Sequence, residues 1–119
     1  MIEKIGIGID IVDTKRFEKL PYSANITFYK KIFDTNEIKY CLKFKNPFPH
    51  FAGMFALKEA TIKAIKKQIA FIDIKISHSN SKPQVRIKGS KNKKYKFILS
   101  VSHEKKIAVA VVISETLKL

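Results

Sequence analysis

The stretch Ile5-Gly6-Ile7-Gly8-Ile9-Asp10-Ile11-Val12 decides the fold of the N-terminal part of this chain. Its strict alternation predicts a β-strand over residues 2 to 12, because successive side chains of a strand point to opposite faces. The four isoleucines then share one face, and Gly6, Gly8 and Asp10 share the other. Two absent side chains beside a carboxylate leave room for a ligand, so we expect Asp10 to belong to a binding site.

A second stretch, from Phe55 to Lys63, predicts a helix that is apolar nearly all round and that runs from about residue 50 to residue 67. Lys58, Glu59 and Lys63 are the charged residues between Phe55 and Lys63. A buried charge is costly unless it is paired. We therefore expect these side chains to have partners, and the partners to mark a site.

The remaining pattern predicts helices first and strands afterwards. Shorter helical segments are expected over residues 15–20, 22–33 and 35–45, and strands over residues 71–77, 84–87, 95–102 and 107–113, with a hairpin connection at 103–106. This order predicts an α+β fold, in which an N-terminal strand and helices are followed by a small antiparallel sheet. The length fits a single domain over residues 1–119.

The formal net charge of +14 favours an anionic partner. A nucleic acid, a membrane surface, a phosphorylated small molecule and an acidic protein all satisfy that condition. Lysine far outnumbers arginine, and isoleucine, phenylalanine and asparagine are plentiful. The coding bias of an AT-rich genome is therefore an equally good explanation of much of the excess.

Two common features of exported and membrane proteins are missing from the sequence. No stretch approaches the roughly 18 to 20 apolar residues of a membrane span, and the N-terminus lacks the pattern of a signal peptide. The lone Cys41 cannot form an internal disulfide and is expected to be a small buried side chain. We expect a cytoplasmic protein without redox chemistry.

Asp10 and Glu59 together suggest a site for Mg²⁺. This ion prefers oxygen ligands and commonly uses one or two carboxylates plus substrate phosphates, whereas zinc favours His and Cys clusters. Glu59 and Lys63 are four residues apart on one helix face, so the ammonium can meet a phosphate of the same ligand. The same spacing is also that of an ordinary surface ion pair. Asp10 and the apolar surroundings favour the site.

The other motifs in the sequence do not by themselves indicate a catalytic or binding site. Ser102 and His103 are adjacent on a predicted strand and point to opposite faces, which argues against a hydrolase dyad. The pair Gly6-x-Gly8 lacks the third glycine of a dinucleotide fingerprint. His50 and His78 have no metal-like spacing and are expected to face solvent.

Four motifs follow one another along the chain. They are Gly6-Ile7-Gly8-Ile9-Asp10-Ile11-Val12 with Arg16, Phe51-Ala52-Gly53-Met54-Phe55-Ala56-Leu57-Lys58-Glu59-Ala60 with Lys63-Ala64, Lys82-Pro83 before a strand, and Ser102-His103-Glu104 before Ala108-Val109-Ala110-Val111. Taken in this order, they resemble the motifs of the holo-[acyl-carrier-protein] synthases. The resemblance covers nearly the whole chain. It implies a 4'-phosphopantetheinyl transferase, which moves the phosphopantetheine arm of coenzyme A to a serine of apo acyl carrier protein and releases adenosine 3',5'-bisphosphate. It also implies an α+β protomer assembled as a homotrimer, with coenzyme A between neighbouring subunits.

The resemblance also implies roles for individual residues. Asp10 and Glu59 correspond to the magnesium ligands, Lys63 to the lysine that faces the diphosphate, and Glu59 is the best candidate to accept the serine proton. The nucleotide end of coenzyme A corresponds to Lys82, Pro83, Ser102 and His103. The basic first helix, with Lys15, Arg16 and Lys19, would meet the acidic carrier protein and give the positive charge a purpose. Neither a nucleic acid nor a membrane is then an expected partner.

The chain departs from the family pattern at the phosphate contacts. Met54 stands where the family usually places an arginine, and Ser81 replaces a glycine before Lys82-Pro83. The glycine-rich residues that commonly follow Lys63-Ala64 are absent, and the stretch 89–94 is too short for the helix that many relatives carry there. Lys43, Lys45 or His50 are candidates to replace the missing arginine.

Two readings from other classes remain open at this point. A small basic RNA-binding module would explain the charge and the aromatic residues interleaved with lysine. A non-catalytic oligomeric scaffold would use the apolar strands of the C-terminal half as its interface. The RNA-binding reading leaves Asp10 and Glu59 without a role, and the scaffold reading predicts no magnesium dependence.

Overall fold

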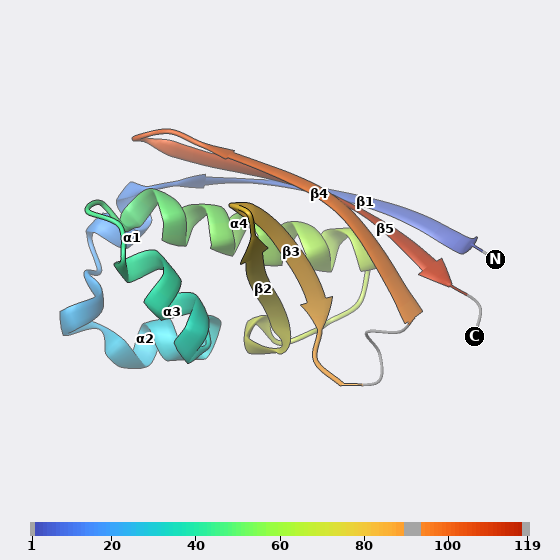
Figure 1. Ribbon diagram of the computed structural model, residues 1–119, viewed down its shortest axis with the longest axis horizontal. Coiled ribbons are helices and arrows are strands. Elements are labelled where there is room, and N and C mark those ends of the chain that lie inside the picture. Colours follow the sequence, from blue (N-terminus) through green and yellow to red (C-terminus); the bar gives the residue numbers. More distant parts are fainter. Residues whose placement is uncertain (1, 90–93, 118–119) are drawn as a thin grey trace.

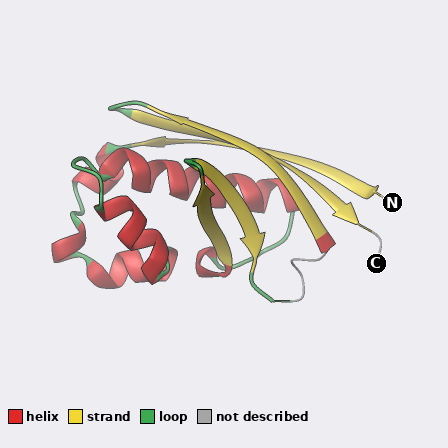
Figure 2. Ribbon diagram, in the orientation of Figure 1, coloured by secondary structure: helices red, strands yellow, loops and turns green. Residues whose placement is uncertain are grey.

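The longest helix, α4 (Phe48–Ile65), lies beneath a three-stranded antiparallel sheet, and the shorter helices and a two-stranded hairpin cover its other side (Figure 1). The computed structural model describes residues 2–89 and 94–117. The separation of helices from antiparallel strands, visible in Figure 2, confirms the predicted α+β class.

The helices and strands follow one another in the predicted order. Before α4 come β1 (Ile2–Asp13), α1 (Lys15–Glu18), the 3₁₀ turn η1 (Tyr22–Ala24), α2 (Ile26–Ile32) and α3 (Thr35–Leu42). After it come the 3₁₀ turn η2 (Phe71–Asp73), β2 (Ile74–Ser79), β3 (Lys82–Ile87), β4 (Tyr95–His103) and β5 (Ile107–Leu117).

Several predicted elements were wrong in their extent: β5 ends at Leu117 rather than at residue 113, β3 begins at Lys82 rather than at residue 84, and α3 ends at Leu42 rather than at residue 45. The helix expected over residues 22–33 is broken at Asn25, whose φ of −141° and ψ of 38° are not helical, so η1 and α2 are separate. The strand expected from residue 71 begins at Ile74, because Phe71–Asp73 forms η2. Element boundaries are set by such local turns, which apolar periodicity does not resolve.

The strands form two sheets rather than one. The larger sheet has the order β1-β5-β4, and β2 pairs with β3 in a hairpin. The N-terminal strand thus joins the C-terminal strands as an edge of their sheet, with Gly8 opposite Val112 and Asp10 opposite Ala110. This pairing connects residues about a hundred positions apart, which alternation within one strand cannot predict.

Gly6 and Gly8 do not leave room for a ligand, and the sequence-based interpretation of their face was wrong. A Cβ atom added at Gly6 would fall on the carbonyl oxygen of Ala64, and one added at Gly8 on the carbonyl oxygen of Ala60. The glycines allow the backbones of β1 and α4 to approach closely. Asp10 follows them on the same face of β1 and so faces α4 as well.

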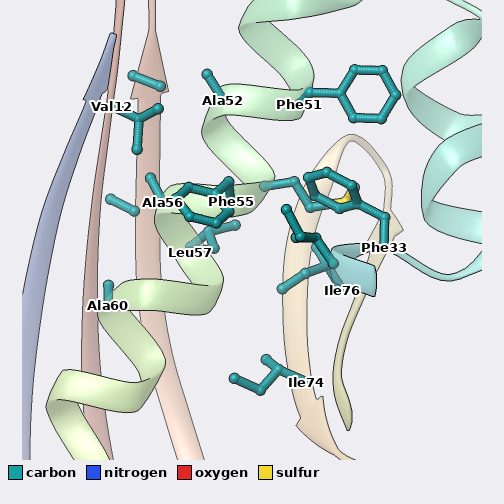
Figure 3. Close-up of a cluster of buried hydrophobic side chains, with 14 of the residues drawn as sticks. Val12, Phe33, Phe51, Ala52, Phe55, Ala56, Leu57, Ala60, Ile74 and Ile76 are labelled. Atoms are coloured by element: carbon teal, nitrogen blue, oxygen red, sulfur yellow. The ribbon is translucent and has the colours of Figure 1, made fainter. Parts of the chain in front are cut away.

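The isoleucine face of β1 points away from the helix. The side chains of this face are between 58% and 67% exposed, and they are Ile5, Ile7, Ile9 and Ile11. The core lies instead between α4 and the elements on both sides of it, as Figure 3 shows for Val12, Phe51, Ala56 and Ile76. None of the helices among the described residues has the length and hydropathy needed to cross a membrane.

Lys58 has the partners that its burial requires. Its ammonium donates to Glu37 Oε1 at 2.8 Å and to the carbonyl oxygens of Ile32 at 2.8 Å and Phe71 at 2.9 Å. Glu37 Oε2 accepts from the backbone N–H of Ile76 at 2.7 Å. The expectation of a partner is therefore confirmed for Lys58, and this group joins α3, α4, η2 and β2.

Candidate active site

Asp10 and Lys63 meet where the edge strand β1 passes over the C-terminal half of α4. Lys63 Nζ donates to Asp10 Oδ1 at 3.1 Å and to the carbonyl oxygen of Ile9 at 3.0 Å. The Asp10 side chain is 16% exposed and the Lys63 side chain 52%. Both charges are therefore accessible from the open edge of the sheet, where a ligand can reach them.

Glu59 lies one helical turn before Lys63 on the same face of α4 and is partly buried. Side chains of a helix lean toward its N-terminus. The Lys63 side chain therefore points back along α4 toward Glu59. Asp10, which Lys63 contacts, lies on the same side of the helix. We call Asp10, Glu59 and Lys63 the carboxylate group.

The oxygen atoms of Asp10 and Glu59 are chemically suited to bind Mg²⁺. Asp10 and Glu59 supply carboxylate oxygens, which hard cations prefer, and water and substrate phosphates commonly complete such sites. Among the described residues no set of three or more His, Cys, Asp or Glu side chains is arranged to hold a metal ion. A site in which two carboxylates bind the ion and a substrate supplies the other ligands has only two such side chains, so it would not form a set of three.

A separate cavity of about 480 Å³ lies on another side of α4. Its lining includes Pro83, Ser102 and His103 from the predicted nucleotide-binding set. Lys82 begins β3 and is exposed; its neighbours Ser81 and Pro83 line the cavity. Met54, where the resemblance implies an arginine, also lines it.

The carboxylate group and this cavity lie on different faces of α4. Met54 and Glu59 are five residues apart, which separates them by roughly 140° around a helix of 3.6 residues per turn. The fold of one chain therefore pairs Asp10 with Lys63, one helical turn after Glu59, and brings Pro83, Ser102 and His103 together in the lining of the cavity on another face of the helix.

Two histidines that were expected to face solvent are instead partly buried in the cavity lining, and that expectation was wrong. His50 stacks on Phe44 with ring centroids 3.6 Å apart, and His78 stacks on Tyr40 at 3.7 Å. His50 also lies 4.8 Å from His103, centroid to centroid. Nothing in the spacing of these residues along the chain indicated that they meet, because they come from α4, β2 and β4.

The cavity changes the acid–base properties of its histidines. Burial lowers the pKa of His50, and the nearby imidazoles of His103 and His78 and the ammonium of Lys43 lower it further. Burial also lowers the pKa of His78, again with a contribution from Lys43. Both imidazoles are therefore held in their neutral form at neutral pH.

The basic residues of the first helix contribute neither to the Asp10–Lys63 ion pair nor to the lining of the cavity. Lys15, Arg16 and Lys19 are exposed on α1 and at its C-terminal end. The guanidinium carbon of Arg16 lies 5.3 Å from the ring centroid of Phe55, within cation–π distance. This contact orients Arg16, and α1 presents a cationic surface.

Comparison with known proteins identifies the family. The family model described as the 4'-phosphopantetheinyl transferase superfamily matches residues 6–112. The chain belongs to this superfamily. Within it, the chain is 44% identical over 116 residues to the holo-[acyl-carrier-protein] synthase of Thermodesulfovibrio yellowstonii, which covers 95% of this chain and 98% of the relative. It is 40% identical over 121 residues to the same enzyme of Halothermothrix orenii, with 92% and 96% covered.

Solved structures of the superfamily have the same fold. The holo-(acyl-carrier-protein) synthase of Bacillus anthracis, solved in complex with CoA (3',5'-ADP), matches with a TM-score of 0.79 and 32% identity and covers 94% of this chain and 96% of its own. The Helicobacter pylori holo-[acyl-carrier-protein] synthase, in complex with coenzyme A, matches with a TM-score of 0.79 and 36% identity, with 91% and 98% covered. The family resemblance predicted from the four motifs is confirmed.

Proposed function

We propose that this protein is a holo-[acyl-carrier-protein] synthase, which transfers 4'-phosphopantetheine from coenzyme A to a serine hydroxyl of apo acyl carrier protein. The family match over residues 6–112 carries this proposal. Relatives with at least 40% identity over nearly the whole chain have that name, and two solved relatives were captured with coenzyme A or its nucleotide part. The carboxylate group supplies residues suited to the chemistry.

The reaction is an in-line displacement at phosphorus. The serine oxygen bonds to the phosphorus of the pantetheine arm, and the bond to the other half of the diphosphate breaks, so adenosine 3',5'-bisphosphate leaves with that oxygen. Such reactions depend on positioning and charge neutralisation. Mg²⁺ bound by Asp10 and Glu59 would neutralise diphosphate charge.

The residues of this chain supply the remaining functions. The ammonium of Lys63 contacts the diphosphate, and Asp10, its ion-pair partner at 3.1 Å, keeps that ammonium beside the strand edge. Glu59 accepts the serine proton, directly or through a water molecule. Lys82, Pro83, Ser102 and His103 bind the nucleotide end of coenzyme A.

We further propose a homotrimer with its active sites between subunits. The isoleucine face of β1 is exposed, although an apolar strand at a sheet edge normally needs a cover. The carboxylate group and the cavity also lie on different faces of α4. A cyclic assembly places one face of each subunit against a different face of its neighbour. The carboxylate group of one subunit can then meet the nucleotide-binding residues of the next.

The partner protein is recognised by charge. Lys15, Arg16 and Lys19 form an exposed cationic surface, which is complementary to an acidic acyl carrier protein. We propose that the reaction takes place in the cytoplasm. We expect Arg16→Ala to raise the KM for the carrier protein and to leave the KM for coenzyme A nearly unchanged.

A mass-shift assay tests the proposed function. Purified protein with Mg²⁺ and coenzyme A should add about 340 Da to apo acyl carrier protein, which is the mass of the transferred group. Asp10→Ala and Glu59→Ala should each abolish the shift while the circular dichroism spectrum stays that of the folded protein. An unchanged carrier mass with the wild-type protein would contradict the proposed function, and wild-type rates in both variants would contradict the assigned ligands.

A further inference from the structure

All three histidines of the chain line one cavity, although they stand at positions 50, 78 and 103. They come from three elements, α4, β2 and β4, that meet at this place. Each is held by a ring contact: His50 on Phe44, His78 on Tyr40, and His103 against the edge of His50. Their positions are therefore fixed by packing before any ligand binds.

The electrostatic character of this histidine cavity is suited to an anion. None of the residues that line it is an aspartate or a glutamate. An adjoining cavity shares the walls formed by Tyr40, Phe44 and His78 and adds Lys43, whose ammonium lies 4.5 Å from the centroid of the Tyr40 ring. Among the residues that the structure describes, no permanently charged side chain lines the histidine cavity itself. The imidazoles are thus the groups in its lining that can become cationic near neutral pH.

An anion in this cavity would reverse the effect of burial on the imidazoles. Without ligand, the pKa of His50 is lowered by burial and by the other two histidines and Lys43, and the pKa of His78 by burial and Lys43. A phosphate dianion favours the charged imidazolium and raises both pKa values. Tyr40 faces the same space, and burial raises the pKa of its hydroxyl group, so that group stays neutral.

We propose that His50, His78 and His103 bind a terminal phosphate monoester of the nucleotide substrate as imidazolium ions, so that substrate binding takes up protons. This inference rests on the proposed function, because coenzyme A carries a phosphate of this kind on its ribose. It makes His50 and His78 specificity-determining residues. In a chain with Met54 rather than an arginine in this cavity, the imidazoles would then favour coenzyme A over dephospho-coenzyme A.

The shape and lining of the cavity agree with this ligand. Apolar side chains, among them Met54, Leu57 and Val101, line it together with the imidazoles and hydroxyl groups. A site with an apolar wall and few polar groups is typical for a small nucleotide. A metal ion fits less well, since no set of these histidines is arranged as metal ligands among the described residues.

Calorimetric titration with coenzyme A and dephospho-coenzyme A tests the proposal. Both ligands share the diphosphate and the thiol and differ only in the phosphate monoester. Between pH 7.0 and 8.5 this phosphate keeps its charge, because its second pKa is near 6. We expect the Kd of coenzyme A to rise about three- to tenfold per pH unit. The uptake of one proton on binding corresponds to a tenfold change in Kd per pH unit. The Kd of dephospho-coenzyme A should stay nearly constant.

Two further measurements separate the histidines from other groups. The double variant H50Q/H78N should lose more than half of the pH dependence for coenzyme A. Lys39→Gln removes a charge from the exposed surface of α3 and should keep the wild-type dependence. Because the chain has three histidines, the imidazole NMR signals of the wild-type protein report on this cavity alone, and saturating adenosine 3',5'-bisphosphate should raise their pKa values.

The outcomes distinguish this proposal from the proposed function. Equal pH dependence for both ligands, or imidazole pKa values that the bisphosphate leaves unchanged, would overturn the phosphate site even if the carrier protein is modified normally. A carrier mass that stays unchanged, together with raised imidazole pKa values, would overturn the proposed function and support the phosphate site.

Discussion

Lys58 Nζ donates a 2.8 Å hydrogen bond to Glu37 Oε1 in the protein interior, where neither side chain has any exposed surface. Burial lowers the pKa of the Lys58 ammonium, and the Glu37 carboxylate opposes this shift. Four further hydrogen bonds complete the group, from Lys58 to two backbone carbonyls and to Glu37 from the backbone N–H groups of Asp34 and Ile76. A charge in the middle of the family motif is thus structural, whereas Lys63, five residues later and on another face of the helix, is part of the carboxylate group.

Lys58→Met should therefore destabilise the protein strongly. The substitution leaves Glu37 as a buried charge without its cation, and such losses cost about 3 to 5 kcal/mol. Urea unfolding at fixed protomer concentration measures the change. Lys63→Met is the matched control on the same helix, since its side chain is half exposed and should cost less than about 1 kcal/mol.

A second variant keeps this prediction testable if Lys58→Met does not fold. Adding Glu37→Gln to Lys58→Met removes the unpaired charge while an amide oxygen remains to accept backbone hydrogen bonds. The double variant should recover part of the lost stability. Equal free energies of unfolding for Lys58→Met and Lys63→Met would contradict the structural role of the pair.

Gly8→Ala should destabilise the packing of β1 on α4. The added methyl group would fall on the carbonyl oxygen of Ala60, so the two backbones must separate. We expect the free energy of unfolding to fall by about 1 to 3 kcal/mol, as it does when extra methylene groups are inserted into a well-packed core. The control is Gly53→Ala, whose added Cβ would lie 3.4 Å from the nearest atom, in the side chain of Val101, and which should be neutral or slightly stabilising. A thermal melt that is unchanged by Gly8→Ala would show that the backbones are not in contact there.

These cases show what the sequence could predict and where it failed. Alternation correctly predicted the strand around Asp10 and the division of its faces, because side-chain direction follows from local geometry. Alternation could not predict whether a second copy, a helix or a ligand covers each face. The space left by a glycine can be filled by the backbone of a helix as readily as by a substrate. The motifs identified the family, but His50 and His78 were misjudged because only the tertiary fold brings them beside His103.

If the active site lies between subunits, two defective chains should complement each other. Glu59→Ala damages the carboxylate group, and Lys82→Ala/His103→Ala damages the nucleotide-binding residues. In trimers that mix both chains at random, about a quarter of the interfaces combine two intact halves. Co-refolded mixtures should then transfer phosphopantetheine at up to about a quarter of the wild-type rate at low coenzyme A. A rate equal to the mean of the separate variants would place the whole site within one chain.

The isoleucine face of β1 should be needed for assembly. Ile7→Lys puts a charge at the centre of this face, where the side chain is 66% exposed in the single chain. If a neighbouring subunit covers it, the charge is buried and the trimer dissociates. Light scattering after size exclusion should then give the mass of a monomer. Ile26→Lys, at an exposed isoleucine of α2, should keep the mass of the assembly. A trimeric Ile7→Lys variant would exclude this face as the interface.

The histidine cavity should also give the ligand-free protein an acid-sensitive stability. The pKa values of His50 and His78 are lowered in the folded state, so the unfolded chain binds more protons just below its own histidine pKa of about 6.5. Stability from this source is complete above that pH and is lost as the pH falls through the lowered folded values.

Thermal melts between pH 5.0 and 7.5 measure this loss, and H50Q/H78N should flatten the profile. Saturating adenosine 3',5'-bisphosphate should counteract the loss, because a bound phosphate raises the folded-state pKa values toward or above that of the unfolded chain. The stabilisation by the nucleotide should therefore grow as the pH falls from 7.5 toward 6.5, whereas a nucleotide without the phosphate monoester should stabilise equally across this range. A stabilisation that grows equally for both nucleotides would attribute the pH dependence to groups outside the cavity.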